Sequence, residues 1–189
     1  IQGSGTVNGY GGAIWMSSGD STNALTLTGG TIRGFNAGDG AGVYMGNGTF
    51  NMTGGAIQSC SATDGGGVYV DGGTFEMTDG TISACNATNA GGGVYVSSGT
   101  FEMSGGSIEN CTAARDGAGV KVLVSSGKAS FSMSGGTIEG SSRDGVSIAA
   151  IGSGTSEFSM SGGTIEDNSG FGVWVDNGSA VMSGGSVKG

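Results

Sequence analysis

The chain has no proline and no histidine, and only 11% of its 189 residues are charged, whereas 45 are glycine. Average proteins contain roughly 7% glycine and 5% proline, so both departures are large. Without proline, the glycine does not belong to a collagen Gly-X-Y repeat. Without histidine, a cysteine nucleophile has no ready base, and a zinc site would need four other converging ligands. We therefore expect neither a metal nor a cofactor.

Basic residues are also scarce: six lysines and arginines stand against fifteen acidic residues, for a formal charge of −9. Nucleic-acid binding needs clustered positive charge, so we expect no such partner. No apolar run is long enough to span a bilayer, so we expect no membrane insertion of this segment. Because the chain begins at Ile1, we expect a processed or partial sequence in which residues 1–189 form one repeat domain.

An apolar landmark recurs along the whole chain, usually just after a Gly-Gly step. Neighbouring landmarks are separated by 22 to 30 residues, and the differences in length fall in connections rich in glycine and serine. Self-similarity at such a period is typical of solenoid proteins. The seven landmarks are Ile32, Ile57, Ile82, Ile108, Ile138, Ile165 and Val187.

Each repeat contains three short segments in which apolar and polar residues alternate, for example 93–96, 100–103 and 107–109. Alternation with period two indicates a strand with one buried face, and the intervening glycines allow tight bends. No periodic run is long enough for a stable helix. The pattern predicts an all-β fold, a right-handed parallel β-helix of about seven coils, each of about 25 residues with three short strands. Seven coils at the strand spacing make a rod roughly 34 Å long.

All eight methionines fall on positions that face inward in this scheme, and a phenylalanine precedes five of them by two residues. Stacking like on like extends a core along one dimension, so each coil is buried only by its neighbours. Met16 and Met45 lie in the first strand of their coils, and Met182 lies in the second strand of the last. The predicted core stacks are Phe50, Phe75, Phe101, Phe131 and Phe158, and Met52, Met77, Met103, Met133 and Met160.

Two kinds of block carry a resemblance to a known group of proteins. Gly-Gly-Ala-Ile occurs at 11–14 and 54–57, and Gly-Gly-Gly-Val-Tyr-Val at 65–70 and 91–96. The chain resembles, over its whole length, the right-handed parallel β-helix repeats of bacterial cell-surface proteins, such as adhesins and autotransporter passengers. The resemblance implies secretion, an extracellular or cell-surface location, and a structural or adhesive role.

A row of aromatic residues is the most suggestive candidate surface. The residue between the two inward positions of the first strand points outward, and it is aromatic in five of seven coils. Aromatic faces spaced by one strand separation form a platform for sugar rings or for another chain. Cross-strand stabilisation explains the same row without a ligand. The candidate binding surface is Trp15, Tyr44, Tyr69, Tyr95 and Trp174, with Lys121 and Ser147 in the two remaining coils.

Cys60, Cys85 and Cys111 occupy one position in three consecutive coils, three residues after the landmark isoleucine. We expect a stack of mostly reduced, buried thiols, since free cysteine behaves as a small hydrophobe. One disulfide between neighbouring coils is the alternative, and it is favoured in an oxidising compartment.

Acidic residues recur just before the first strand of several coils. Stacked oxygen ligands suit calcium, but the nonapeptide pattern of calcium-binding solenoids is missing. Turn geometry explains aspartate and asparagine at these positions without a metal. The positions are Asp39, Asp64, Asn89, Asp116 and Asp144.

The repeat pattern bears on four possible functions. Polysaccharide-cleaving enzymes use similar folds, but they need paired carboxylates facing a groove, whereas the acids here follow the repeat. Ice binding would use the outward row Thr49, Thr74 and Thr100. Asn51, Glu76 and Glu102 lie beside this row, and the charges of the two glutamates prevent a uniform face. We therefore expect a non-enzymatic structural or adhesive module, with no catalytic residues. A filament subunit that stacks head to tail, and a module that binds surface glycans through its aromatic row, are the alternatives.

Overall fold

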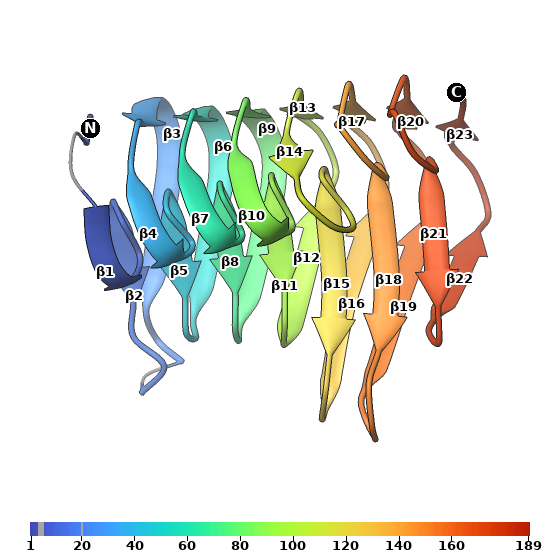
Figure 1. Cartoon of the computed structure of the whole chain (residues 1–189), viewed down its shortest axis with the longest axis horizontal. Helices are drawn as coiled ribbons and strands as arrows, with labels where there is room; N and C mark the ends of the chain where they lie inside the picture. Colours follow the sequence, from blue (N-terminus) through green and yellow to red (C-terminus); the bar gives the residue numbers. More distant parts are fainter. Residues whose placement is uncertain (4–5, 20) are drawn as a thin grey trace.

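The computed structural model describes residues 1–3, 6–19 and 21–189, and every regular element in these ranges is a β-strand (Figure 1). The strands lie side by side along the long axis of the molecule, from β1–β3 at one end to β21–β23 at the other. All strand pairs are parallel and join one coil to the next. The predicted parallel β-solenoid of about seven coils is confirmed. No helix in the described part is long and apolar enough to cross a membrane.

The seven-stranded sheet contains one strand from each coil, among them the two Val-Tyr-Val segments. Its central strands have three residues, whereas β15 and β18 have five and reach further down in Figure 1. Its strands are β2 (Ile14–Met16), β5 (Val43–Met45), β8 (Val68–Val70), β11 (Val94–Val96), β15 (Val120–Val124), β18 (Val146–Ala150) and β21 (Val173–Asp176).

The eleven-stranded sheet contains both the Phe-x-Met segments and the landmark isoleucines. In three coils the two segments form one ten-residue strand: β3 (Ala24–Arg33), β6 (Thr49–Gln58) and β9 (Thr74–Ser83). In the later coils they are separate strands: β12 (Gly99–Met103), β13 (Ser107–Glu109), β16 (Lys128–Met133), β17 (Thr137–Glu139), β19 (Thr155–Met160), β20 (Thr164–Glu166), β22 (Ser179–Met182) and β23 (Ser186–Val187).

A five-stranded sheet forms the third face, and the alternation pattern did not predict it. The pattern had assigned the isoleucine segment to a face of its own. Segments such as Asn86–Ala90 hold only small or polar residues, and their buried residues, Ala87 and Ala90, are only alanines, so they show little hydrophobic alternation. The strands are β1 (Thr6–Tyr10), β4 (Asn36–Asp39), β7 (Ser61–Asp64), β10 (Asn86–Ala90) and β14 (Thr112–Ala113).

One residue in the left-handed conformation turns the chain from the eleven-stranded sheet to the third face. Ser59, Ala84 and Asn110 have φ of 52°, 51° and 55°. The glycine block before each Val-Tyr-Val segment is required by close packing between coils. A Cβ on Gly67 would lie 2.5 Å from the oxygen of Gly93 and 2.7 Å from Cγ2 of Ile82. A side chain there would push neighbouring coils apart.

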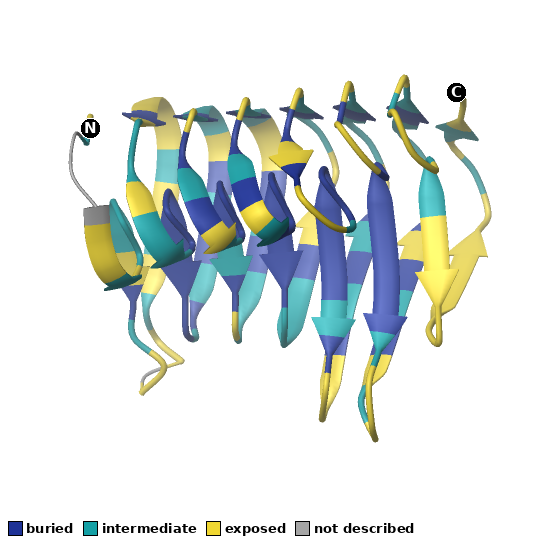
Figure 2. Ribbon diagram, in the orientation of Figure 1, coloured by how far each residue is buried: buried dark blue, intermediate teal, exposed yellow. Residues whose placement is uncertain are grey.

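The core consists of identical side chains piled coil over coil. The rings of Phe50, Phe75, Phe101 and Phe131 are 4.7 Å apart at 8° to one another, and Phe158 follows at 5.2 Å. These residues are buried, and Figure 2 shows the buried positions concentrated in the middle coils. Met182 differs from the expected core: it pairs in register with Met160 but is 50% exposed, because no further coil covers it.

Candidate functional site

The predicted aromatic row is in register along the seven-stranded sheet, but its expected exposure is wrong in the middle. Tyr44 and Tyr95 are only 7% exposed, and Tyr69 is half-buried. The rings stack face to face, with centroids 5.3 Å apart for Tyr44–Tyr69 and 4.9 Å for Tyr69–Tyr95. Each ring therefore covers the faces of the next, and no open platform of tyrosine faces remains.

Hydrogen bonding and burial hold these tyrosines in the neutral state. The hydroxyl of Tyr44 donates to the carboxylate of Asp71 at 2.8 Å. Burial raises the pKa of Tyr69 to about 12, and burial, together with the bond to Asp71, raises the pKa of Tyr44 further. The pKa of Tyr95 is raised by burial in the same way. The tyrosine stack therefore forms a second packed layer on the outer face of the seven-stranded sheet, with polar groups at its edge.

The two tryptophans lie outside the tyrosine stack. Trp15 is in register with Tyr44 but is 59% exposed. The ring that stacks on Tyr44 is instead that of Tyr10, the last residue of β1, with the two ring centroids 4.6 Å apart. Trp174 is 40% exposed and makes an edge contact with Phe171 at 5.9 Å. These two indoles, and not the tyrosines, are the exposed aromatic groups of the row.

A groove opens where the tyrosine row ends. Lys121 and Ser147 follow Tyr95 in the row, before Trp174, and their side chains fill less space than tyrosine rings. A hollow of about 250 Å³ lies over them, and an adjoining hollow beside Tyr95 shares Leu123 and Ile151 with it. We call this continuous depression the coil-5 groove, because Lys121 belongs to β15, the fifth strand of the seven-stranded sheet. Its lining includes Asn89, Arg115, Asp116, Lys121, Leu123, Ser147, Ala149, Ile151, Trp174 and Asp176.

The groove coincides with the departures from strict repetition. The coil between Ile108 and Ile138 is the longest of the series, and β15 and β18 are lengthened within it and the next coil. The five-stranded sheet ends at β14, and a loop then leads through Arg115 and Asp116 into β15 (Figure 1). The lengthened strands supply Leu123 and Ala149 to the floor, and the loop supplies a charged wall.

Among the lysines that the structure describes, Lys121 alone is buried, at 4% exposure. Its ammonium donates to the hydroxyl of Ser147 at 2.9 Å and pairs with Asp116 at 3.4 Å. By contrast, the ammonium of Lys128 lies in an exposed pair with Glu157. The sequence had shown Lys121 and Ser147 only as breaks in the aromatic row. Together with the extra coil length, those breaks were the available signal for a site.

The three cysteines are free thiols, and each is buried in one continuous stack. The thiol of Cys85 points at the carbonyl oxygens of Ser83 and Ile57, at 3.4 and 3.7 Å. Asn168, at the same position two coils after Cys111, donates to the corresponding carbonyls of Glu166 and Ile138. The thiols therefore form a ladder of weak hydrogen bonds to the same carbonyl positions that the Asn168 amide uses. Contact with the next thiol, and then burial, raise the pKa of both Cys60 and Cys85.

The acidic residues before the first strand bond to the neighbouring coil. Asp39 accepts the backbone N–H of Asp64, and Asp64 accepts both the side-chain amide of Asn89 and the backbone N–H of Ala90. Burial raises the pKa of Asp39 and Asp64. In the described part of the chain, no three side chains of metal-ligating type converge. These carboxylates are occupied in joining coils.

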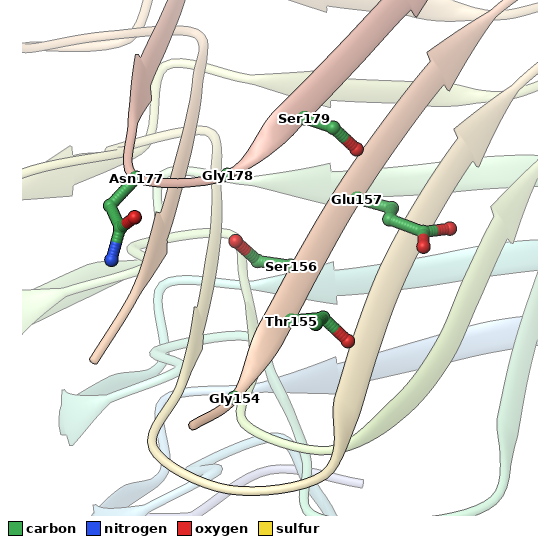
Figure 3. A pocket seen from close by; sticks show the side chains of 7 residues that line it. All are labelled: Gly154, Thr155, Ser156, Glu157, Asn177, Gly178 and Ser179. Carbon is green, nitrogen blue, oxygen red and sulfur yellow. The ribbon is translucent and has the colours of Figure 1, made fainter. Parts of the chain in front are cut away.

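A second depression, shown in Figure 3, lies at the turn between β21 and β22 and against the start of β19. The side chain of Ser156 points to the inner side of β19, whereas Thr155 and Glu157 point to the other side. Glu157 is paired with Lys128 at 2.8 Å. The lining is small and polar, without an aromatic group, so this hollow is a weaker candidate than the coil-5 groove.

Comparison with known proteins shows the family of the chain. The model of a family described as right handed beta helix region matches residues 41–189, most of the chain. No curated protein and no solved structure matches the chain. The matched range contains the tyrosine stack from Tyr44 onward, the cysteine ladder and the coil-5 groove.

Proposed function

Because the chain belongs to the right-handed β-helix family, we propose that it is a non-enzymatic module on the outside of a bacterial cell, serving as a stiff rod with a structural or adhesive role. The observation that supports this is the unbroken like-on-like core from Phe50 to Phe158. A core of this kind leaves no hinge between coils, so the rod keeps its shape when it projects from a surface.

The acids of the groove favour a binding role over a cleaving one. Glycoside cleavage requires two carboxyl groups on opposite sides of the scissile bond, free to exchange protons. Asp116 is paired with Lys121, and Asp176 lines the groove from β21, the strand that also carries Trp174. Incubation with a panel of polysaccharides, followed by measurement of new reducing ends and of unsaturated sugar products, tests this part. Release of either product above a buffer control contradicts the non-enzymatic assignment.

The location is tested on cells of the source organism. Antibodies raised against the chain should label intact cells as strongly as permeabilised ones, and added protease should remove the signal. Labelling only after permeabilisation contradicts a surface role. Small-angle scattering of the purified chain should give a rod whose length is close to seven strand spacings, roughly 34 Å.

The coil-5 groove favours a second function, binding of carbohydrate. The exposed indole of Trp174 stands at one end of a depression whose floor mixes hydroxyl, ammonium and apolar groups. Sugars bind to such surfaces by stacking one face on an aromatic ring while their hydroxyls bond to polar groups. The tyrosine stack forms the other end of the groove rather than the platform itself.

A glycan array tests this second function with two matched variants. Trp174→Ala removes the exposed indole in the groove, and Trp15→Ala removes a still more exposed indole that does not line it. We expect Trp174→Ala to weaken glycan binding about tenfold or more, since stacking and burial on an indole are worth more than 1 kcal/mol. Trp15→Ala should leave binding unchanged. Equal binding by both variants contradicts a sugar site in the groove.

A further inference from the structure

The three buried thiols form a row whose spacing is set by the coil step. Cys60, Cys85 and Cys111 each follow a phenylalanine of the core stack by ten residues. In these three coils the phenylalanine rings repeat every 4.7 Å and lie at 8° to one another. Neighbouring coils are therefore related almost purely by translation, so equivalent atoms in them repeat at nearly the same step.

The three sulfur atoms share one orientation. Each thiol contacts the carbonyl oxygen two residues earlier in the chain, at 3.4 Å for Cys60 and Cys85 and at 3.5 Å for Cys111. Cys85 and Cys111 also contact the carbonyl oxygen of the landmark isoleucine in the preceding coil, at 3.7 and 3.9 Å. Because the contacts repeat from coil to coil, the sulfurs of this cysteine ladder lie in one line, about one coil step apart.

A step of this length fits a linear bridge of sulfur, metal and sulfur. A thiolate–zinc bond is about 2.3 Å long, and other closed-shell ions of the late transition metals form bonds of similar length, so two opposed bonds span roughly 4.6 Å. A disulfide fits less well, because its two sulfurs must approach to about 2.05 Å. The coils can hold a bridging ion with little movement, whereas a disulfide would draw them together.

Two-coordinate ions lie outside the chemistry that the lack of histidine excludes. A structural zinc ion requires four ligands, and in the part of the chain that the structure describes no three ligating side chains converge. Copper(I) selects soft thiolate ligands, and both copper(I) and silver(I) are stable with only two of them. The cysteine ladder therefore suits monovalent soft ions and not zinc.

Backbone N–H groups are placed to support a thiolate in the ladder. Contact with the next thiol raises the pKa of Cys60 and Cys85, but backbone donors act in the opposite direction. The N–H groups of Phe35 and Gly34 lower the pKa of Cys60, and the N–H of Cys60 lowers the pKa of Cys85. When an ion replaces the thiol protons, these donors still stabilise the sulfurs, as the outer partners of metal ligands do.

We propose that the cysteine ladder binds one copper(I) or silver(I) ion between the sulfurs of two neighbouring coils. Cys85 is a ligand in either arrangement, and its partner is Cys60 or Cys111, each one step away. Cys60 and Cys111 are two steps apart, which is too far for one ion to join. Binding releases two thiol protons to solvent and transfers no electron. Because the ion joins two coils of the folded chain, it stabilises the fold.

Binding is measured on the whole reduced chain in the absence of oxygen. Copper(I) is supplied in competition with the chelator bicinchoninate, and silver(I) is supplied separately because it needs no reductant. We expect one ion to be retained per chain, the melting temperature to rise, and X-ray absorption of the bound metal to show two sulfur neighbours. Three or more neighbours, or no retention of either ion, overturns the proposal. Because unmodified protein is used, a folding defect cannot imitate the result.

Three matched variants locate the ion. Cys85→Ala removes the ligand common to both pairs and should weaken binding by about a hundredfold or more, since a residue that only orients a metal ligand is already worth about 10- to 100-fold. Cys60→Ala and Cys111→Ala each leave one pair intact and should bind nearly as tightly as the unmodified chain. All three variants remove a buried sulfur from equivalent turns, so thermal melts compare their folding directly.

The rival soft ligand is methionine, and Met182 is exposed in the last coil. Copper binding that Cys85→Ala leaves unchanged assigns the ion to thioethers and overturns the proposal. Equal losses in all three variants indicate a site that needs three sulfurs, which contradicts the linear geometry. Zinc(II) is the control ion, and its retention by the unmodified chain but not by Cys85→Ala also contradicts a two-coordinate site.

Discussion

The coils from Val43 to Cys111 and those from Thr112 to Asp176 share one core but differ on their outer surface. In the first region, tyrosines stack outside the seven-stranded sheet and thiols stack at the turn. In the second, lysine, serine and asparagine replace them, strands lengthen, and the groove opens. Where side chains repeat on both the inner and the outer face of the sheets, their stacking stabilises both faces. Where the repeat is relaxed on the outer face alone, a hollow forms there and the core is unchanged.

The largest effect is expected from breaking the phenylalanine stack in the regular region. Phe101→Ala removes a ring that is packed between two others and should cost about 3 to 5 kcal/mol of unfolding free energy. Phe158→Ala should cost less, because the next coil offers Ala180 instead of a ring. Urea unfolding measures both. Equal costs would show that the stack adds nothing beyond burial of each single ring.

Raising the pH should attack the regular region first. Tyr44, Tyr69 and Tyr95 have raised pKa values in the folded chain, whereas unfolded tyrosines ionise near about pH 10. Above that pH the folded state holds more protons than the unfolded state, so stability falls as pH rises. Tyrosinate absorbance should therefore appear together with unfolding. Ionisation of all the tyrosines near pH 10 with the fold intact would contradict the buried stack.

The turn ladder permits a comparison of thiol and amide. Asn168→Ala should cost about 2 kcal/mol, because Asn168 donates two bonds and also accepts the N–H of Ser141. Cys85→Ala should cost about 1 kcal/mol, because its thiol contacts are longer and weaker. Chemical denaturation measures both costs. A cost for Cys85→Ala that equals or exceeds that of Asn168→Ala argues against this account of the ladder.

Lys121→Tyr should convert the irregular surface toward the regular one. A tyrosine at this position extends the stack from Tyr95, and such ring pairs are worth about 0.5 to 1.5 kcal/mol. We expect a higher melting temperature together with loss of glycan binding, because the ring fills the groove. A variant that is stabilised and still binds glycans would place the binding site elsewhere.

The smallest effect is expected at the acid ladder. Burial raises the pKa of Asp39, so ionising this carboxyl group costs stability as the pH rises from the pKa of the unfolded chain to the raised value, and the full cost remains above it. Asp39→Asn keeps the oxygen that accepts the N–H of Asp64 and should gain on the order of 0.5 kcal/mol at neutral pH. The gain should vanish near pH 3, where the aspartic acid is already protonated. Melting curves at both pH values check this, and a gain of equal size at pH 3 contradicts it.

Part of the fold and part of the candidate site could be predicted from the sequence, and particular residues show why the rest could not. The spacing of Ile32 to Val187 predicted the coils, and the Phe-x-Met pairs predicted the core, because burial of one strand face leaves a clear period-two signal. The five-stranded sheet was not predicted because its inward residues, such as Ala62 and Ala87, are too small to give a clear hydrophobic alternation among their polar neighbours. The outward position of the tyrosines followed from alternation, but their burial did not.

The amino-acid order by itself determined that similar side chains meet at each coil step, because a parallel strand at fixed spacing brings each residue beside its repeat equivalent. Only the tertiary structure decided which outward positions stay open. Ring stacking shields Tyr44 and Tyr95, whereas the shorter or smaller Lys121 and Ser147 leave a hollow that longer strands and a charged loop enclose. The exposure of a side chain depends on the residues that neighbouring coils place around it. Alternation along a single strand does not reveal those residues.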